Sequence, residues 1–179
     1  MNAIELASLE SGAINSFIAL LVGLLGLTVF IFLKPIPSNA KYLTLGVMLP
    51  LMGLFVLTFY QSFSSTICWD DKQLRVNIPL YSHTIEVNQV DFAQARVVNL
   101  LKEPEYAAKW RTNGLGIPRY SLGWFSLNNG DKALLSVTDP TQVIMLPISQ
   151  DKMIMVSVID ADKALAQLHA SALALEPID

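Results

Sequence analysis

Residues 14–33 read INSFIALLVGLLGLTVFIFL, a run without a single charged side chain. A helix of about 20 residues, rising ~1.5 Å per residue, is long enough to cross the ~30 Å hydrocarbon core of a bilayer. A second run of similar length, residues 43–63, reads LTLGVMLPLMGLFVLTFYQSF and is also uncharged. Because neither run carries the polar stripe of a soluble core helix, the sequence predicts two transmembrane helices.

The linker between these runs, residues 34–42, has the sequence KPIPSNAKY. Pro35 and Pro37 interrupt helices, and Ser38 and Asn39 are typical turn residues. The two apolar runs are therefore expected to form a helical hairpin with a short connection.

The charges that flank the hairpin bear on targeting and orientation. The N-terminal flank holds Glu5 and Glu10 but no Lys or Arg, whereas a secretory signal peptide begins with basic residues. Lys34 and Lys41 stand at the two ends of the linker, and positive residues tend to stay in the cytoplasm. We therefore expect a cytoplasmic linker, with both termini and the soluble domain outside the cytoplasm.

The overall composition excludes several classes of protein. Hydrophobic residues make up 53% of the chain and charged residues only 15%, below the ~25% that is typical of soluble domains. A net charge of -3 argues against nucleic-acid binding, which usually requires a basic face. The single cysteine, Cys68, cannot form an internal disulfide and is expected to be a small buried residue beside the membrane.

After the second apolar run the pattern changes to short, β-branched or alternating segments separated by turn residues. Such segments indicate an antiparallel sheet. The predicted strands cover residues 65–69, 73–78, 83–87, 95–100, 121–127, 132–137, 142–147 and 153–158.

Two turns and a final helix complete this part of the sequence. Asn129-Gly130 predicts a two-residue hairpin turn with positive φ at both positions, and Asp139-Pro140 predicts a second turn. Near the C-terminus, apolar residues recur at spacings of three and four, which predicts an amphipathic helix with Asp160 or Asp162 as its N-cap. These apolar residues are Leu165, Leu168, Ala172 and Leu175.

The most specific stretch, residues 111–149, reads RTNGLGIPRYSLGWFSLNNGDKALLSVTDPTQVIMLPIS. Its spaced glycines, its Gly-Trp-Phe triplet, its Asn-Gly turn and its Thr-Asp turn resemble the bacterial pleckstrin homology (PH) domain family. The resemblance covers residues 65–175 and is strongest from Arg111 onward. It implies a mainly-β domain in residues 65–179, with about seven strands in a curved antiparallel sheet or barrel closed by a C-terminal helix. Residues 1–64 then supply an N-terminal tail and the membrane hairpin.

The resemblance also implies a function. Bacterial PH domains next to short membrane hairpins are interaction modules without known catalysis, so we expect a non-catalytic scaffold of the bacterial inner membrane that recruits a protein partner. The alternatives are an accessory subunit or enzyme of the cell envelope, or a module that binds anionic lipid. The basic loop that holds phosphoinositides in eukaryotic members has no equivalent here, since residues 79–82 contain no Lys or Arg.

No catalytic, cofactor or metal site is expected from the motifs. Gly114-Leu-Gly116 lacks the third glycine and the flanking strand and helix of a dinucleotide-binding loop. His83 and His169 are not at metal-ligand spacing from each other or from Cys68. The neighbouring carboxylates Asp70-Asp71 and Asp160-x-Asp162 fit turns and a helix start better than acid–base catalysis.

One group of residues combines cations with aromatic rings and is our candidate contact site for lipid or a partner. It consists of Lys109, Trp110, Arg111, Arg119 and Tyr120. Aromatic rings settle at the headgroup level of a membrane while cations meet phosphates or acidic partners. The alternative is an ordinary strand surface with Trp124 in the core. Trp69 and Tyr60 are expected to belong to the aromatic belt where the second helix leaves the membrane.

Overall fold

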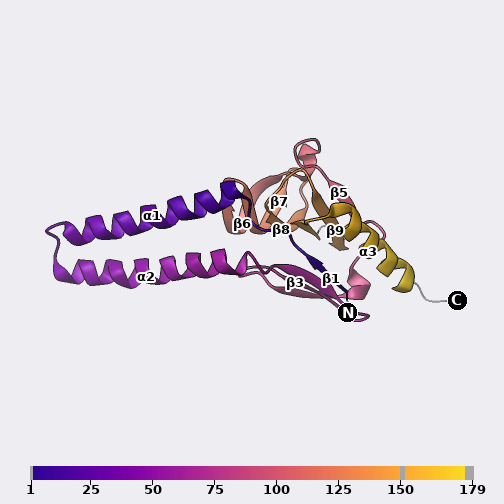
Figure 1. The fold of residues 1–179 in the computed structure, drawn as a ribbon, viewed down its shortest axis with the longest axis horizontal. Coiled ribbons are helices and arrows are strands. Elements are labelled where there is room, and N and C mark those ends of the chain that lie inside the picture. The colour runs from indigo at the N-terminus through magenta and orange to yellow at the C-terminus, as the bar shows by residue number, and fades with distance from the viewer. Residues whose placement is uncertain (1, 150–151, 176–179) are drawn as a thin grey trace.

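The computed structural model describes residues 2–149 and 152–175, which form a long helical hairpin and a mainly-β domain at its open end (Figure 1). The helices are α1 (Ser11–Leu33), α2 (Ser38–Gln61) and α3 (Ala161–Leu175), with short 3₁₀ turns at Val87–Gln89 and Pro104–Tyr106. The strands are β1 (Asn2–Glu5), β2 (Thr66–Trp69), β3 (Gln73–Asn77), β4 (His83–Glu86), β5 (Arg96–Val98), β6 (Ala108–Ile117), β7 (Tyr120–Leu127), β8 (Lys132–Val137), β9 (Val143–Ser149) and β10 (Lys152–Ser157).

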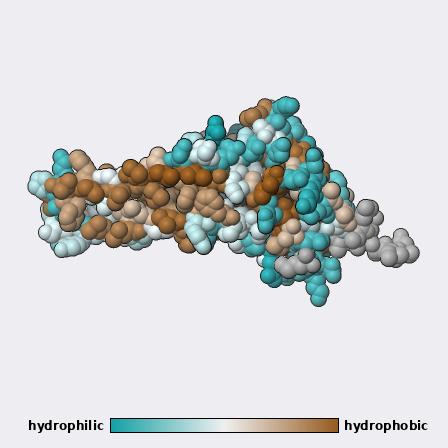
Figure 2. Space-filling model, in the orientation of Figure 1, coloured by the Kyte–Doolittle hydropathy of each residue, from teal (hydrophilic) through white to brown (hydrophobic). Residues whose placement is uncertain are grey.

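The hairpin agrees closely with the two apolar runs of the sequence. Helices α1 and α2 are each long and apolar enough to cross a membrane, and little of their apolar surface is buried within the chain. Figure 2 shows hydrophobic surface along the hairpin and hydrophilic patches over its closed tip and over the β domain. The linker is shorter than expected, because α2 already begins at Ser38.

A small sheet joins the two ends of the hairpin. Its strand order is β1-β2-β3-β4, and all of its pairings are antiparallel. Strand β1 precedes α1 and pairs with β2, which follows α2, so that Ala3 lies opposite Cys68. The chain therefore leaves this sheet to form the hairpin and returns to the same sheet. Residues 2–5, expected in an N-terminal tail, contribute its first strand.

The larger sheet has six strands in the order β5-β9-β10-β8-β7-β6. Neighbouring strands are antiparallel except for β8 and β10, which are parallel, with Ile154 opposite Leu134. The predicted mainly-β domain with a C-terminal helix is confirmed, but its sheets are open and include one parallel pair, whereas a curved antiparallel sheet or barrel of about seven strands was expected. Parallel pairing is possible here because β9 separates β8 from β10 in sequence and lies on the far side of β10.

The two sheets pack face to face around one main core. Side chains from the small sheet, such as Leu74 and Val76, share this core with Leu122 and Ile154 of the large sheet. A second buried cluster, which includes Phe125 and Met155, lies on the opposite face of the large sheet. Strands β8 and β10 are consequently buried on both faces, and this explains their nearly continuous apolar sequences.

The turn after β7 differs in detail from the expected two-residue turn. The amide of Gly130 donates to the carbonyl of Leu127, and the amide of Leu127 donates to the carbonyl of Asp131. Gly130 has φ +98°, but Asn129 is not among the residues with positive φ. This is the pattern of a type I turn followed by a glycine bulge, which needs positive φ at only one position.

Helix α3 begins as the sequence predicts. The backbone amide of Lys163 donates to Asp160 Oδ1 at 3.0 Å, so Asp160 is the N-cap. Ala164 and Leu168 face the main core, and burying a leucine side chain contributes roughly 1.5 to 3 kcal/mol. The side chains of Ala172 and Leu175 lie outside the described residues.

The burial of two residues close to the end of α2 differs from the sequence prediction. Trp69 is 3% exposed, contacts Phe92, and donates from Nε1 to Ser171 Oγ at 2.8 Å. It is therefore a core residue that ties β2 to α3, and its assignment to the aromatic belt was wrong. Cys68, expected to be buried, is half-buried because it alternates with Ile67 and Trp69 and points to the other face of the small sheet.

Candidate functional site

The base of the hairpin is embedded in the β domain. Phe17 of α1 is 1% exposed, and its ring lies 5.4 Å from that of Phe59, 6.5 Å from that of Phe55 and 5.9 Å from that of Tyr120. Two aromatic residues of α2 and one of β7 thus close around a residue of α1. This packing determines the position of the β domain relative to α1 and α2.

Tyr120 belongs to this junction and not to a contact surface. It is 2% exposed, and its hydroxyl lies 3.1 Å from Ser62 Oγ, which donates in turn to the carbonyl of Thr58. Burial raises the pKa of Tyr120, and its side-chain hydrogen bonds with Ser62 and Ser136 oppose that rise only in part. The inclusion of Tyr120 among the contact residues is corrected, because alternation along β7 points its ring into the core.

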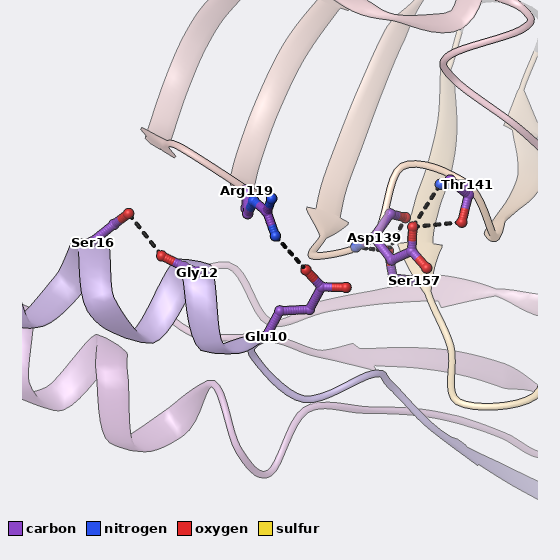
Figure 3. Close-up of polar contacts among 7 residues, drawn as sticks. All are labelled: Glu10, Gly12, Ser16, Arg119, Asp139, Thr141 and Ser157. Carbon is purple, nitrogen blue, oxygen red and sulfur yellow. Dashed lines mark hydrogen bonds and ion pairs between the residues drawn. The ribbon is translucent and has the colours of Figure 1, made fainter.

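Arg119 lies beside the start of α1. It occupies the β6–β7 turn with φ +64°, and its guanidinium reaches Glu10 at 3.5 Å between Nη1 and Oε2 (Figure 3). Its side chain also crosses Gly12, where an added Cβ would stand 2.5 Å from Arg119 Cδ. Both charged groups are largely exposed, so this ion pair is worth on the order of 1 kcal/mol or less.

Figure 3 also shows the turn between β8 and β9. Asp139 Oδ1 accepts hydrogen bonds from the amide and the hydroxyl of Thr141, at 2.8 and 2.7 Å. Ser157 Oγ donates to the carbonyl of Asp139 at 2.8 Å. The predicted Asp139-Pro140 turn is therefore present, and its polar groups serve the fold.

Strand β6 carries the remaining candidate contact residues. It is the outer strand of the large sheet and lies on the side of the domain nearest the hairpin (Figure 1). Lys109, Trp110 and Arg111 are all exposed, and 71% of Trp110 is accessible. Among the described residues, neither Lys109 nor Arg111 forms an ion pair. This surface, Lys109 to Arg111, is called the β6 patch below.

The free edge of β6 is poorly suited to pairing with another strand. Its register with β7 shifts between Ala108 and Trp110 and again between Arg111 and Asn113. Irregular pairing and charged residues are the means by which natural edge strands avoid edge-to-edge association. A partner of the β6 patch would therefore contact its side chains and would not form backbone hydrogen bonds with β6.

Two glycines allow β6 and β7 to approach closely. Gly114 and Gly123 are opposite each other, with φ +148° and +109°. A Cβ on Gly123 would collide with the carbonyl oxygen of Asn113, and one on Gly114 would collide with that of Leu122. Gly114, considered in the sequence as part of an incomplete nucleotide-binding motif, and Gly123, of the Gly-Trp-Phe triplet, thus shape the β6–β7 hairpin near α1.

An apolar cavity of about 200 Å³ lies between the hairpin and the domain. Its walls come from α2, from the β3–β4 turn and from β6. The lining residues are Leu54, Phe55, Thr58, Leu80, Tyr81, Gly114 and Leu115. A larger, open hollow of about 460 Å³ lies between β1 and the start of α3 and is lined by both polar and apolar groups.

The histidines lie apart in the structure. His83 is exposed on β4 with its ring 6.1 Å from that of Trp124, and His169 Nε2 lies 2.9 Å from the carbonyl oxygen of Ala95. Trp124 itself is half-buried and packs against the main core. In residues 2–149 and 152–175, no cluster of three His, Cys, Asp or Glu side chains is arranged to hold a metal ion.

The structure combines two open sheets and a C-terminal helix with two helices that are long and apolar enough to cross a membrane. The family model described as "Bacterial PH domain" matches residues 65–171, which is more than half of the chain. The chain therefore belongs to the bacterial PH domain family. Searches of curated proteins and of solved structures found no match. PH domains are generally non-catalytic binding modules for proteins or lipids.

Proposed function

We propose that this protein is a membrane-tethered, non-catalytic PH module that positions a protein partner at the bacterial inner membrane. The observation that supports this most directly is the β6 patch. There, Trp110 stands 71% exposed between Lys109 and Arg111 on the edge strand of the large sheet.

The chemistry of the β6 patch favours an acidic protein surface as its partner. Tryptophan and arginine are the residue types that most often dominate binding energy at protein interfaces. The two cations would meet carboxylates on the partner, whereas the chain as a whole is acidic, with a net charge of -3. The patch is thus a positively charged region on an acidic protein, and its charge would orient the partner during association.

A photo-crosslinking amino acid at Thr112 tests this proposal in intact cells. Thr112 is exposed on the same strand and is not itself part of the β6 patch. We expect one defined protein adduct, reduced about 30-fold by Trp110→Ala, because a hot-spot tryptophan contributes about 2 kcal/mol or more.

The matched control is Leu101→Ala, which removes an apolar side chain that is also 71% exposed but lies in the loop after β5. It should leave the adduct unchanged. Adducts that contain only lipid, or a protein adduct that is insensitive to Trp110→Ala, would contradict recruitment through the β6 patch. A lipid-only result would instead favour binding of an anionic membrane surface.

We also propose that α1 and α2 span the membrane with their linker in the cytoplasm. Alkaline carbonate should leave the full chain in the membrane pellet, because each helix contains an uncharged apolar run long enough to span a bilayer. A reporter that is active only outside the cytoplasm should work when it is fused after Asp179 and should fail when it is inserted between Pro35 and Pro37. The reverse pattern would invert the orientation, and release by carbonate would exclude a spanning hairpin.

A further inference from the structure

The turn between β3 and β4 displays a leucine in a conformation that leucine seldom adopts. Leu80 has φ +62°, in the left-handed region, and its side chain is 48% exposed. Residues with a branched side chain populate this region rarely, and such outliers cluster at ligand sites where the surroundings enforce them. The main core does not require the strained backbone or the exposed side chain of Leu80, because other residues of the turn, such as Ile78, already pack into that core.

Leu80 forms one wall of the 200 Å³ cavity at the base of the hairpin. Leu54 and Phe55 of α2 form the facing wall, and Leu115 of β6 closes one side. The strained turn therefore holds an apolar side chain at a cavity that the transmembrane hairpin and the domain build together.

The polar atoms around this cavity are already paired. Thr58 Oγ1 donates to the carbonyl of Leu54 at 2.8 Å, and Tyr81 Oη donates to Asn113 Oδ1 at 3.0 Å. No charged residue is among the lining residues. A cavity lined mainly by apolar side chains, with its two hydroxyl groups already donating elsewhere, gives ordered water few partners and suits an apolar occupant.

The depth of the cavity indicates where that occupant comes from. Leu54 precedes the last residue of α2, Gln61, by seven residues, which is about 10 Å of helix at 1.5 Å per residue. If α2 crosses the bilayer, this wall lies where the apolar helix leaves the domain, and Leu54, which is 43% exposed, faces lipid. The surrounding medium at this depth is then lipid chains and not water.

We propose that the cavity between α2, the β3–β4 turn and β6 holds an acyl chain of a membrane phospholipid. The chain lies against Leu54 and Phe55, with Leu80 on its outer side, and fixes the domain against the hairpin. This inference rests on the membrane insertion proposed above, but it is independent of the protein partner at the β6 patch.

The test uses the full chain in phosphatidylcholine nanodiscs that contain phosphatidylglycerol with a diazirine in one acyl chain. The protein is moved into lipid-free detergent before irradiation, so that only retained lipid can react. We expect adducts on the segments that contain Leu80 and Leu115. Leu80→Gly should reduce them about tenfold, because one apolar wall is lost while glycine adopts the positive φ without strain. Leu115→Trp should reduce them similarly by filling the space.

Two matched variants separate this site from ordinary surrounding lipid. Leu101→Gly removes an exposed leucine far from the cavity in sequence, and Val47→Trp adds a ring at an exposed position of α2 nearer the hairpin tip. Both should retain wild-type labelling at Leu80. Absence of retained label at Leu80 and Leu115, or equal labelling in Leu80→Gly and the wild type, would overturn the proposal. Carbonate extraction of the same variants reports on membrane insertion separately, so the two failures are distinguishable.

Discussion

Replacing Gly123 with valine is expected to destabilise the β domain by about 3 kcal/mol or more, because a β-branched residue would be strained at φ +109° and would clash across the sheet. Its Cβ would collide with the carbonyl oxygen of Asn113 and lie 2.7 Å from Gly114 Cα. A loss of this size lowers the melting temperature by roughly 6 to 12 °C in a domain of 150 to 250 residues. Thermal unfolding of the full chain in mild detergent measures it.

Gly116→Ala is the matched control for this change. Gly116 lies on β6 two residues beyond Gly114, and an added Cβ there would meet only Arg111 Nη1, at 3.8 Å. That is an ordinary contact, so we expect a change within about 0.5 kcal/mol. Similar melting temperatures for Gly123→Val and Gly116→Ala would show that β6 and β7 do not approach as closely as described.

Phe17→Ala is expected to cost about 3 to 5 kcal/mol, the range found when a buried aromatic side chain is truncated. The loss falls on the junction between α1, α2 and β7, because the ring of Phe17 contacts Phe55, Phe59 and Tyr120. The helices themselves should persist, since their backbone hydrogen bonds are internal. Denaturant unfolding, together with protease cleavage between α2 and β2, measures both stability and loosening of the domain.

Val22→Ala supplies the comparison within the same helix. Val22 lies more than one turn further along α1 and is 62% exposed, so it contacts the surrounding medium and not the domain. Its truncation should change stability by less than about 1 kcal/mol and leave the cleavage pattern unchanged. Equal effects of the two substitutions would mean that the β domain is not seated on Phe17.

The hairpin, most of the strands and the start of α3 could be predicted from sequence because local patterns determine them. Uninterrupted apolar runs predict two long helices, which α1 and α2 confirm, and Asp160 caps α3 through atoms only three residues apart. Strand β6 was missed, since its cations and glycines do not alternate with apolar residues. Strand β1 was missed because its partner, β2, lies more than sixty residues away.

The candidate site likewise contains features that the sequence predicts and features that depend on long-range packing. The β6 patch was visible because Lys109, Trp110 and Arg111 are adjacent in sequence. The burial of Tyr120 could not be inferred without knowing that β7 turns that face toward Phe17. The cavity was invisible, since its walls come from three separate segments and depend on a positive φ at Leu80. The sequence offered one indication of this cavity, namely a leucine that directly follows Pro79 in a short turn.

The pairing of β1 with β2 sets an order of events during synthesis. Strand β1 emerges from the ribosome before either helix, but its partner strand emerges only after the whole hairpin. If the hairpin spans the membrane as we propose, the small sheet cannot close until the chain has crossed the bilayer and come back. Both helix ends must then lie on one side, so a chain in which only one helix inserts would leave β1 and β2 on opposite faces of the membrane. Under that proposal, the pairing of β1 with β2 requires a completely inserted hairpin.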